Sequence, residues 1–512
     1  MMTLSNSLII RKNTFSLSQW FWFAFFASLI LKIYLAYLVP ITGDEAEYIG
    51  WAQQLQGGYY DHPPMIAWIL HPFILFSTSN ICARFLQIIT ANFIAVLMYL
   101  GFRSLDREKA YGIALLYLIS PISLFNITIL TDTPLVLFSF LGIFCLFLAE
   151  KDNFRFYYYA LSGVFLGCAY LSKYLMFPLA LCVFIYFLTA TNIPRRLLKG
   201  CLVILGALPF FIQNIVWNYS HDWVNFLFNL ELRNKNSHFT ALHLVTYIAF
   251  LFYMFSPFVI IAIVKRYRTC LTLLHKKPYR LLTLSALLPL LFYAVLAFVK
   301  KIGLHWVFCA YPFLFMLLFG VLHTSTIRRY ARWMFYYTGF QLIIALAVFH
   351  VPLSFWQTKP YFPKINWFLN YEQIEPVLQP YLDQQFILLT PSYAQSYLLT
   401  YKQNKTAAVW GVGTVHGRQD DLSNDFKQFN QKNMVIVDLD RKLSSLSVAP
   451  YFVRYTVLER NLNGMPYRLI IGYGFNYAHY RATVLKAIYL TYYQVPAFLP
   501  RGEFYYKNKY QL

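Results

Sequence analysis

The chain has 512 residues, of which 59% are hydrophobic and 12% are charged, and its formal net charge is +22. A soluble domain carries about 25% charged residues, so this composition excludes a soluble enzyme and indicates a polytopic membrane protein. A nucleic-acid partner is not predicted, because the basic residues lie mainly between apolar segments and not on one compact face. Positive charge in this arrangement is typical of cytoplasmic loops.

Eleven apolar segments predict membrane-spanning helices, because about 20 apolar residues cross a bilayer. The first segment follows Arg11 and Lys12 without a cleavage-site pattern, so we expect a retained span and a cytoplasmic N-terminus. If successive loops alternate between the two sides of the membrane, most loop lysines and arginines fall on the cytoplasmic side. The acids of the first loop then fall on the outer side. The segments are approximately residues 17–40, 80–102, 110–129, 133–149, 156–171, 174–191, 198–217, 241–264, 281–299, 304–322 and 333–351.

Two regions are not expected to span the membrane. Residues 65–76 are too short and follow Pro63 and Pro64, so they predict an interfacial helix on the outer side. From about residue 352, β-prone runs alternate with turn-rich stretches. We therefore expect a transmembrane catalytic domain at 1–351 and a periplasmic α/β domain at 352–512. The runs are FILL at 386–389, AAVWGV at 407–412, MVIV at 434–437, FVRYTVL at 452–458 and RLIIGY at 468–473.

The seven cysteines lie in or beside apolar segments, and no two of them form a CxxC pair. This pattern favours buried cysteines over a disulfide framework or a structural zinc site. The sequence contains no convincing cluster of metal ligands, so no metal site is predicted.

The first outer loop, TGDEAEYIGWAQQLQGGYYDHPP, places three acids directly after an apolar span. Asp44 follows the membrane at once in a loop without a basic residue, which favours a functional carboxylate. For Glu47 we favour a structural role, since acids stabilise helix N-termini. Asp61 and His62 precede two prolines that fix the backbone, which makes them candidates for a ligand contact.

Asp132, in the stretch LTDTPLVLF, lies between two apolar runs at the predicted outer surface. Ionisable groups near a membrane are costly and tend to be functional. The same residue could instead cap the following span, with Pro134 in its first turn. The sequence alone leaves both interpretations open.

Two basic clusters fall on the same predicted side as these acids. Lys173 lies in a break between two spans, and Lys300, Lys301 and His305 belong to the stretch KKIGLHW. Each lysine could simply extend to the membrane interface, as we expect for Lys32 within the first span. Two clusters that face acidic loops favour a phosphate-bearing ligand, since lysine is a good partner for phosphate.

Together these motifs resemble the GT-C-fold glycosyltransferases that use polyprenyl-phosphate sugars. This group contains the protein O-mannosyltransferases and the lipid A aminoarabinose transferase, and the nearest branch is bacterial glycosyltransferase family 39. The likeness covers most of the chain and rests on several motifs in the right order. They are DEAEY, GGYYDHPP, TDTPL, LSKY, NYSHDW and KKIGLHW, with LLTPSYAQSYLLTY and VWGVGTVHGRQDD in the tail.

The resemblance implies roles at the matching positions. Asp44 matches the catalytic aspartate, Glu45 completes the Asp-Glu pair, and Asp132 matches the second acid of the site. Asp61 and His62 fall where the aminoarabinose transferase has an acid followed by a phosphate-binding lysine, which is histidine here.

The charge that this lysine would have carried must then come from elsewhere. Lys173, Lys300, Lys301 and His305 are the candidates for binding the donor phosphate with His62. Tyr60 and Asp222 join Asp61 as candidates for contact with donor or acceptor.

The resemblance implies an inverting glycosyltransferase of the bacterial inner membrane. It would move a hexose or pentose from polyprenyl phosphate to lipid A, lipopolysaccharide or another envelope acceptor at the outer face, with Asp44 as general base. The expected partners are the lipid-linked donor, a lipid or glycan acceptor and the membrane. No cofactor is implied, and a divalent metal stays open.

Three alternatives share parts of this pattern. A transporter or flippase of lipid-linked sugars often has inverted repeats, which we do not find here. A protein O-glycosyltransferase of the eukaryotic type would carry inserted luminal modules, and an O-antigen-ligase-type enzyme would rely on an arginine-rich outer loop. A cavity at the outer face lined by Asp44 and Asp132 would favour the transferase.

Overall fold

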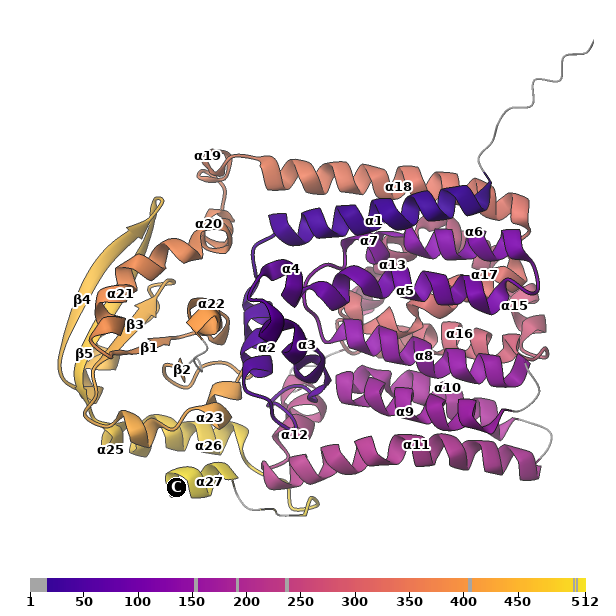
Figure 1. Ribbon diagram of the computed structural model, residues 1–512. Coiled ribbons are helices and arrows are strands. Elements are labelled where there is room, and N and C mark those ends of the chain that lie inside the picture. The colour runs from indigo at the N-terminus through magenta and orange to yellow at the C-terminus, as the bar shows by residue number, and fades with distance from the viewer. Residues whose placement is uncertain are drawn as a thin grey trace, which may run out of the picture.

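The computed structural model describes residues 16–151, 155–189, 193–234, 239–403, 408–500, 502 and 505–512. It consists of a bundle of helices, one end of which is covered by a C-terminal domain built on a β-sheet (Figure 1). We call this end of the bundle the domain end and the opposite end the far end. Arg11 and Lys12, on which the predicted orientation rests, lie outside the described residues.

Seven helices in the described ranges are long and apolar enough to cross a bilayer. The chain is therefore a polytopic α-helical membrane protein, as the composition predicts. These helices are α1 (Leu17–Leu38), α5 (Phe85–Phe102), α8 (Asp132–Lys151), α11 (Ile193–Ser220), α16 (Tyr279–Leu296), the joined η3 (Leu304–Ala310) and α17 (Tyr311–Val321), and α18 (Thr324–His350).

The other four predicted spans are broken or shorter. The segment expected at 241–264 forms α13 (Ala241–Phe255) and α14 (Pro257–Lys265), which meet at 105°. Ser256 has a φ of +69° and Pro257 has no N–H to donate, so the helix cannot continue straight. By length and composition the described residues supply seven full spans, or eight with the bent pair, and not eleven. The three short helices are α6 (Arg107–Leu118), α9 (Phe156–Ser172) and α10 (Phe177–Leu188).

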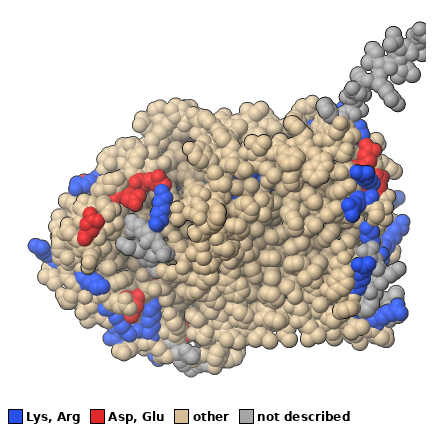
Figure 2. Space-filling model, in the orientation of Figure 1, with Lys and Arg blue, Asp and Glu red and all other residues tan. Residues whose placement is uncertain are grey.

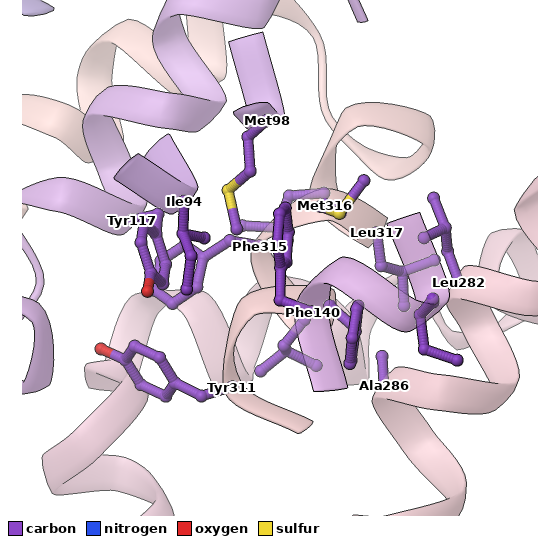
Figure 3. Close-up of a cluster of buried hydrophobic side chains, with 14 of the residues drawn as sticks. Ile94, Met98, Tyr117, Phe140, Leu282, Ala286, Tyr311, Phe315, Met316 and Leu317 are labelled. Carbon is purple, nitrogen blue, oxygen red and sulfur yellow. The ribbon is translucent and has the colours of Figure 1, made fainter. Parts of the chain in front are cut away.

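Helix α17 lies at the centre of the bundle because it is apolar on all sides. Nearly every side chain of YPFLFMLLFGV is buried, which is typical of a helix surrounded by others. Figure 3 shows Phe315 and Met316 of this helix among side chains of neighbouring helices, including Met98 and Phe140. Helix α18 lies at the edge of the bundle (Figure 1) and is mostly exposed, as expected for a helix that faces lipid.

Charged side chains gather at the two ends of the molecule on the face drawn in Figure 2, with a broad band almost free of charge between them. A band of this kind matches the hydrocarbon layer of a bilayer. The charges on the far end in this view are mainly basic.

Short helices lie between the bundle and the C-terminal domain (Figure 1). Helix α2 (Gly43–Gln53) begins after Thr42, whose hydroxyl accepts the Glu45 N–H while the Glu45 carboxylate accepts the Thr42 N–H. This capping box explains why a helix begins here. Helix α3 (Met65–Phe76) is the short helix expected at this position, and its place in the membrane interface stays a prediction. Further short helices are α4 (Asn80–Ala83), α7 (Pro121–Phe125) and α12 (Val224–Leu230).

The C-terminal domain contains a five-stranded sheet of order β2-β1-β3-β5-β4. β1 pairs parallel with β2 and β3, and β5 pairs antiparallel with β3 and β4. All five β-prone runs of the sequence form strands, so the α/β architecture is confirmed, while the boundary at residue 352 stays a prediction. The strands are β1 (Ile387–Thr390), β2 (Ala408–Val409), β3 (Met434–Asp438), β4 (Phe452–Leu462) and β5 (Met465–Phe475).

Helices cover this sheet and connect it to the bundle. The central strand β3 is buried along its whole length, because apolar clusters lie on both faces of the sheet. One helix, α22, packs against α2 of the first loop. The helices include α20 (Phe362–Asn370), α21 (Glu375–Asp383), α22 (Tyr393–Thr400), α23 (Gln419–Ser423), α25 (Tyr477–Tyr480), α26 (Lys486–Tyr492) and α27 (Tyr505–Tyr510).

Candidate active site

Glu45 forms a buried ion pair that holds the first loop in place. Its carboxylate accepts from Arg84 Nε and Nη2, both at 2.7 Å, and from the backbone N–H of Ile129 at 2.9 Å. Arg84 also donates to the carbonyls of Val39 and Pro40 at the end of the first span. Both Glu45 oxygens are therefore occupied and shielded from solvent. This corrects the expectation that Glu45 acts on substrate, because the geometry gives it a positioning role.

Asp44 lies on a different side of α2 from Glu45 and is exposed. One helical residue turns the side-chain direction by about 100°, so adjacent acids in the first turn of α2 face different surroundings. The hydroxyl of Tyr393 donates to Asp44 Oδ1 at 3.1 Å. Asp44 is thus a carboxylate that a ligand can reach, as a general base must be.

Asp132 pairs with Lys173 at the domain end of the bundle. Lys173 Nζ lies 2.7 Å from Asp132 Oδ2, and both side chains are almost fully buried. The other oxygen, Oδ1, has no hydrogen-bond partner among the described residues. Neither oxygen therefore caps the first turn of α8, and a functional role for Asp132 stays a prediction.

Two more acids lie buried close to Asp44. Burial and the charge of Asp44 raise the pKa of Asp61 to about 7, against the opposing effect of Arg233 and Lys173. Burial, followed by the charges of Asp61 and Asp44, raises the pKa of Glu47 well above its ordinary value. Glu47 Oε1 and Asp61 Oδ1 have no hydrogen-bond partner in the described structure. The first loop is thus an acidic cluster in which Asp44 alone is exposed.

His62 is buried beside this cluster and lies 3.9 Å from Asp61, measured from Nε2 to Oδ2. Burial, followed by the charges of Lys173 and Arg233, lowers the pKa of His62 well below its ordinary value. The ring is therefore neutral at pH 7. A neutral ring supplies no charge to a phosphate, and contact between His62 and the donor stays a prediction.

A cavity of about 600 Å³ opens beside the Asp132–Lys173 pair. Its walls are aliphatic and aromatic, and its polar lining includes the cations Lys173, Arg233 and Lys300. Trp306 holds two of them, because Arg233 and Lys300 lie over its ring at 5.3 and 5.2 Å from the centroid. Lys300 also donates to Asn234. The apolar lining includes Tyr170, Tyr174, Leu175, Phe177, Phe211, Phe226, Leu230, Phe292, Tyr293 and Leu296.

This cavity differs in detail from the one expected. Asp44 and Asp132 do not line it, and Lys173 connects Asp132 to its wall. Lys301 is exposed and does not line the cavity, and His305 lies nearby on η3 without lining it. Of the expected phosphate-binding residues, the structure brings Lys173 and Lys300 together with Arg233.

Three other residues have structural contacts in place of their expected ones. The Tyr60 ring is fully buried against Phe228 and Tyr493, so it faces no ligand space. Asp222 accepts the backbone N–H groups of Tyr505 and Tyr506, at 3.0 and 2.8 Å, and so ties the C-terminus to the bundle. Lys32 is buried and donates to Asn92 Oδ1 at 2.9 Å, where we had expected it to extend outward.

Within the described ranges, no group of three histidine, cysteine or acidic side chains lies close enough together to bind a metal ion. The expectation that no cofactor is needed stays a prediction.

Arg84, Arg233 and Tyr393 belong to this site but are not singled out by sequence reasoning. Arg84 stands alone at the start of an apolar segment, in ICARFLQ, and such a residue needs a buried partner. Arg233 lies in a polar loop whose fold the sequence does not give. Tyr393 is one of many tyrosines, and only the docking of the C-terminal domain brings it to Asp44.

Comparison with known proteins identifies the fold. Residues 61–217 match the family model described as dolichyl-phosphate-mannose-protein mannosyltransferase, which is less than half of the chain. ArnT from Cupriavidus metallidurans bound to undecaprenyl phosphate superimposes with a TM-score of 0.61 at 13% identity, over 88% of this chain and 98% of that one. The apo state of ArnT gives 0.60 at 14% identity over the same shares. The chain has the GT-C fold.

A curated relative is similar over a shorter stretch. The lipid A galacturonosyltransferase RgtD of Rhizobium johnstonii is 28% identical over 188 residues, which are 35% of this chain and 38% of the relative. The matching stretch thus spans well under half of that protein. Over that stretch the chain is similar to a lipid A galacturonosyltransferase.

Proposed function

We propose that this protein is an inverting glycosyltransferase that moves a sugar from a polyprenyl-phosphate donor to lipid A or another envelope glycan. The observation that carries the proposal is the cavity at the domain end, where Lys173, Arg233 and Lys300 lie among aromatic and aliphatic walls. An amphiphile with one anionic group and a long hydrocarbon chain fits such a lining, because the cations bind phosphate and the walls bind the chain.

The donor phosphate lies at the three cations in this proposal, and the prenyl chain follows the apolar walls. Trp306 already orders Arg233 and Lys300 before the ligand arrives, so little side-chain entropy is lost on binding. His62 contributes polarity and no charge, since its ring is neutral at pH 7.

Asp44 acts as the general base. It accepts the proton of an acceptor hydroxyl, the acceptor oxygen forms a bond to the anomeric carbon, and the bond from this carbon to the phosphate oxygen breaks. The electron pair of that bond leaves with the polyprenyl phosphate, whose charge Lys173, Arg233 and Lys300 stabilise. A single displacement of this kind inverts the anomeric configuration.

Asp132 holds Lys173 at the edge of the cavity in this mechanism. The pair positions the ammonium group, and the free Asp132 oxygen leaves a polar site open at the same place. Glu45 acts more remotely, through the Arg84 ion pair that fixes the turn bearing Asp44.

Two relatives support the choice of donor and acceptor classes. RgtD is named for galacturonic acid and lipid A, and the ArnT structure holds undecaprenyl phosphate. Polyprenyl-phosphate-linked galacturonic acid is therefore the first donor to test, followed by other hexoses and pentoses. We place the protein in the bacterial inner membrane with the domain end in the periplasm, because basic residues gather at the far end (Figure 2).

Mass spectrometry of envelope lipids tests the proposal in cells. A strain that lacks the gene is complemented with the wild-type chain, with Asp44→Asn, or with Asp383→Asn, a matched change of an exposed acid in the C-terminal domain. We expect a sugar-sized mass difference on lipid A or another envelope lipid with the wild-type chain and Asp383→Asn, and none with Asp44→Asn. Full modification by a stably produced Asp44→Asn variant would contradict the proposal.

A further inference from the structure

The C-terminal domain reaches the first loop through helix α22. Gly43 and Gly50 of α2 face α22 so closely that a Cβ at Gly43 would lie 2.5 Å from Ala394 Cβ, and one at Gly50 would lie 2.7 Å from the Tyr397 ring. Real side chains do not approach to such distances, so the two helices fit only with glycine at these positions. The residue that begins α22, Tyr393, is therefore held at a fixed place beside Asp44.

A second segment of the same domain fixes the Tyr393 ring. Gly417, with a φ of +61°, packs its backbone onto the ring, and a Cβ there would lie 2.1 Å from the ring carbon Cγ. The neighbouring His416 packs edge-to-face against Phe228 of α12, with ring centroids 5.2 Å apart. Phe228 directly precedes Asn229 and Leu230, which line the cavity. The domain thus contacts the surroundings of both the acid and the cavity.

The Tyr393 hydroxyl donates to Asp44 Oδ1 at 3.1 Å. Among the described residues, no other side chain forms a hydrogen bond with the Asp44 side chain. Burial, followed by the charge of Asp44, raises the pKa of Tyr393, so the hydroxyl keeps its proton and acts as donor. With Oδ1 engaged in this bond, Oδ2 is left for the acceptor hydroxyl.

We propose that Tyr393 is a positioning residue for Asp44 and that the C-terminal domain thereby completes the active site. The inference rests on the proposed role of Asp44 as general base. It goes further in giving the sheet domain a part in the reaction, because without Tyr393 the carboxylate would rotate freely at the surface of α2.

Several groups of the described structure face Asp44. Glu47 and Tyr48 belong to the same helix, Asp61 to the end of the loop, and Tyr393 and His416 to the C-terminal domain. Of these, Tyr393 donates a hydrogen bond to the Asp44 carboxylate. Removing its hydroxyl therefore removes the contact that orients Asp44, while the other neighbours stay in place.

The test is Tyr393→Phe in the full-length protein, purified in lipid nanodiscs and assayed with the lipid-linked donor that the wild-type protein uses. Tyr401→Phe is the matched control. Tyr401 directly follows α22, and its hydroxyl lies 3.2 Å from the Tyr371 hydroxyl and does not contact Asp44. Loss of a hydrogen bond to a charged catalytic group typically slows the reaction by about tenfold. We expect kcat to fall about tenfold for Tyr393→Phe, with the KM for donor unchanged.

The outcomes separate this inference from the proposed function. An unchanged kcat in Tyr393→Phe, while Asp44→Asn is inactive, would overturn the inference and leave the function standing. A loss of kcat with an equal rise in the KM for donor, or an equal loss of kcat in Tyr401→Phe, would reduce Tyr393 to a structural contact and also overturn it. An active Asp44→Asn would instead contradict the proposed function.

Discussion

Buried carboxylates at the two ends of the bundle differ in how completely their oxygens are satisfied. At the far end, Glu150 accepts from Tyr159 and Lys199 through Oε1, at 2.6 and 2.7 Å, and pairs with Lys277 through Oε2 at 3.4 Å. At the domain end, Asp132 has one partner, Lys173, and its second oxygen has none among the described residues.

This difference separates a structural ion pair from a site prepared for a ligand. Leaving a buried polar oxygen without a partner costs stability, so native proteins rarely keep one unless it serves another purpose. Asp132, Asp61 and Glu47 each keep such an oxygen at the domain end. At the far end both Glu150 oxygens are engaged, and we expect this group of charges to be needed for folding only.

The largest expected effect follows from breaking the buried pair that orders the first loop. Arg84→Met leaves Glu45 charged and unpaired in the interior, which typically costs about 3–5 kcal/mol of unfolding free energy. Thermal unfolding of the detergent-solubilised protein measures the loss. The double variant Arg84→Met with Glu45→Gln removes both charges and should recover most of the stability. No recovery in the double variant would contradict this role for the pair.

Lys173→Met tests the domain end directly. The change removes a cation from the cavity and leaves Asp132 unpaired, so the leaving phosphate loses stabilisation, and transfer should fall about 10²–10³-fold. The KM for donor should rise as well, because the same charge binds the donor phosphate. A variant with normal transfer would show that the cations of this cavity do not bind the donor.

The corresponding change at the far end is Glu150→Gln. It weakens contacts to Tyr159, Lys199 and Lys277 and should lower the unfolding free energy by about 1–3 kcal/mol. Transfer per folded molecule should stay at the wild-type rate, since this end holds no reacting group. A reduced kcat with unchanged stability would erase the distinction between the two ends.

The smallest effect is a pH dependence of stability from Asp61. Its pKa is raised from 3.8 to about 7, so between these pH values the folded state binds more protons than the unfolded state. Stability due to this group therefore falls as pH rises through that window. Asp61→Asn should unfold about 2–4 °C higher than the wild type at pH 8 and at the same temperature at pH 4. An equal gain at both pH values would assign the effect to packing.

Much of the fold can be predicted from local sequence because each feature has a local cause. The five strands follow from short runs of β-branched and aromatic residues, and the helix at 65–76 follows from an apolar run after two prolines. The count of full-length spans is lower than expected because one apolar segment bends and three others form shorter helices, and hydropathy reveals neither feature. At Ser256 a positive φ before a proline turns the chain by 105° within an unbroken apolar stretch.

The site is only partly predictable for a different reason. Asp44 and Glu45 are adjacent and chemically similar. Their surroundings differ, because Glu45 pairs with Arg84 in the interior whereas Asp44 is exposed beside Tyr393. Lys173 can be singled out by its place in a break between spans. The contribution of Arg233 depends on the fold of a loop, and that of Tyr393 on the docking of a separate domain, so neither follows from sequence pattern.

The central claim is that Asp44 and the cationic cavity together transfer a sugar from polyprenyl phosphate with inversion. The most direct measurement uses the purified protein in lipid nanodiscs with a polyprenyl-phosphate-linked sugar and lipid A, followed by NMR of the product's anomeric configuration. We predict a product of inverted configuration with the wild-type chain, and at least about a 10²-fold slower rate with Asp44→Asn at equal folded yield. A product of retained configuration, or full activity of Asp44→Asn, would contradict the account.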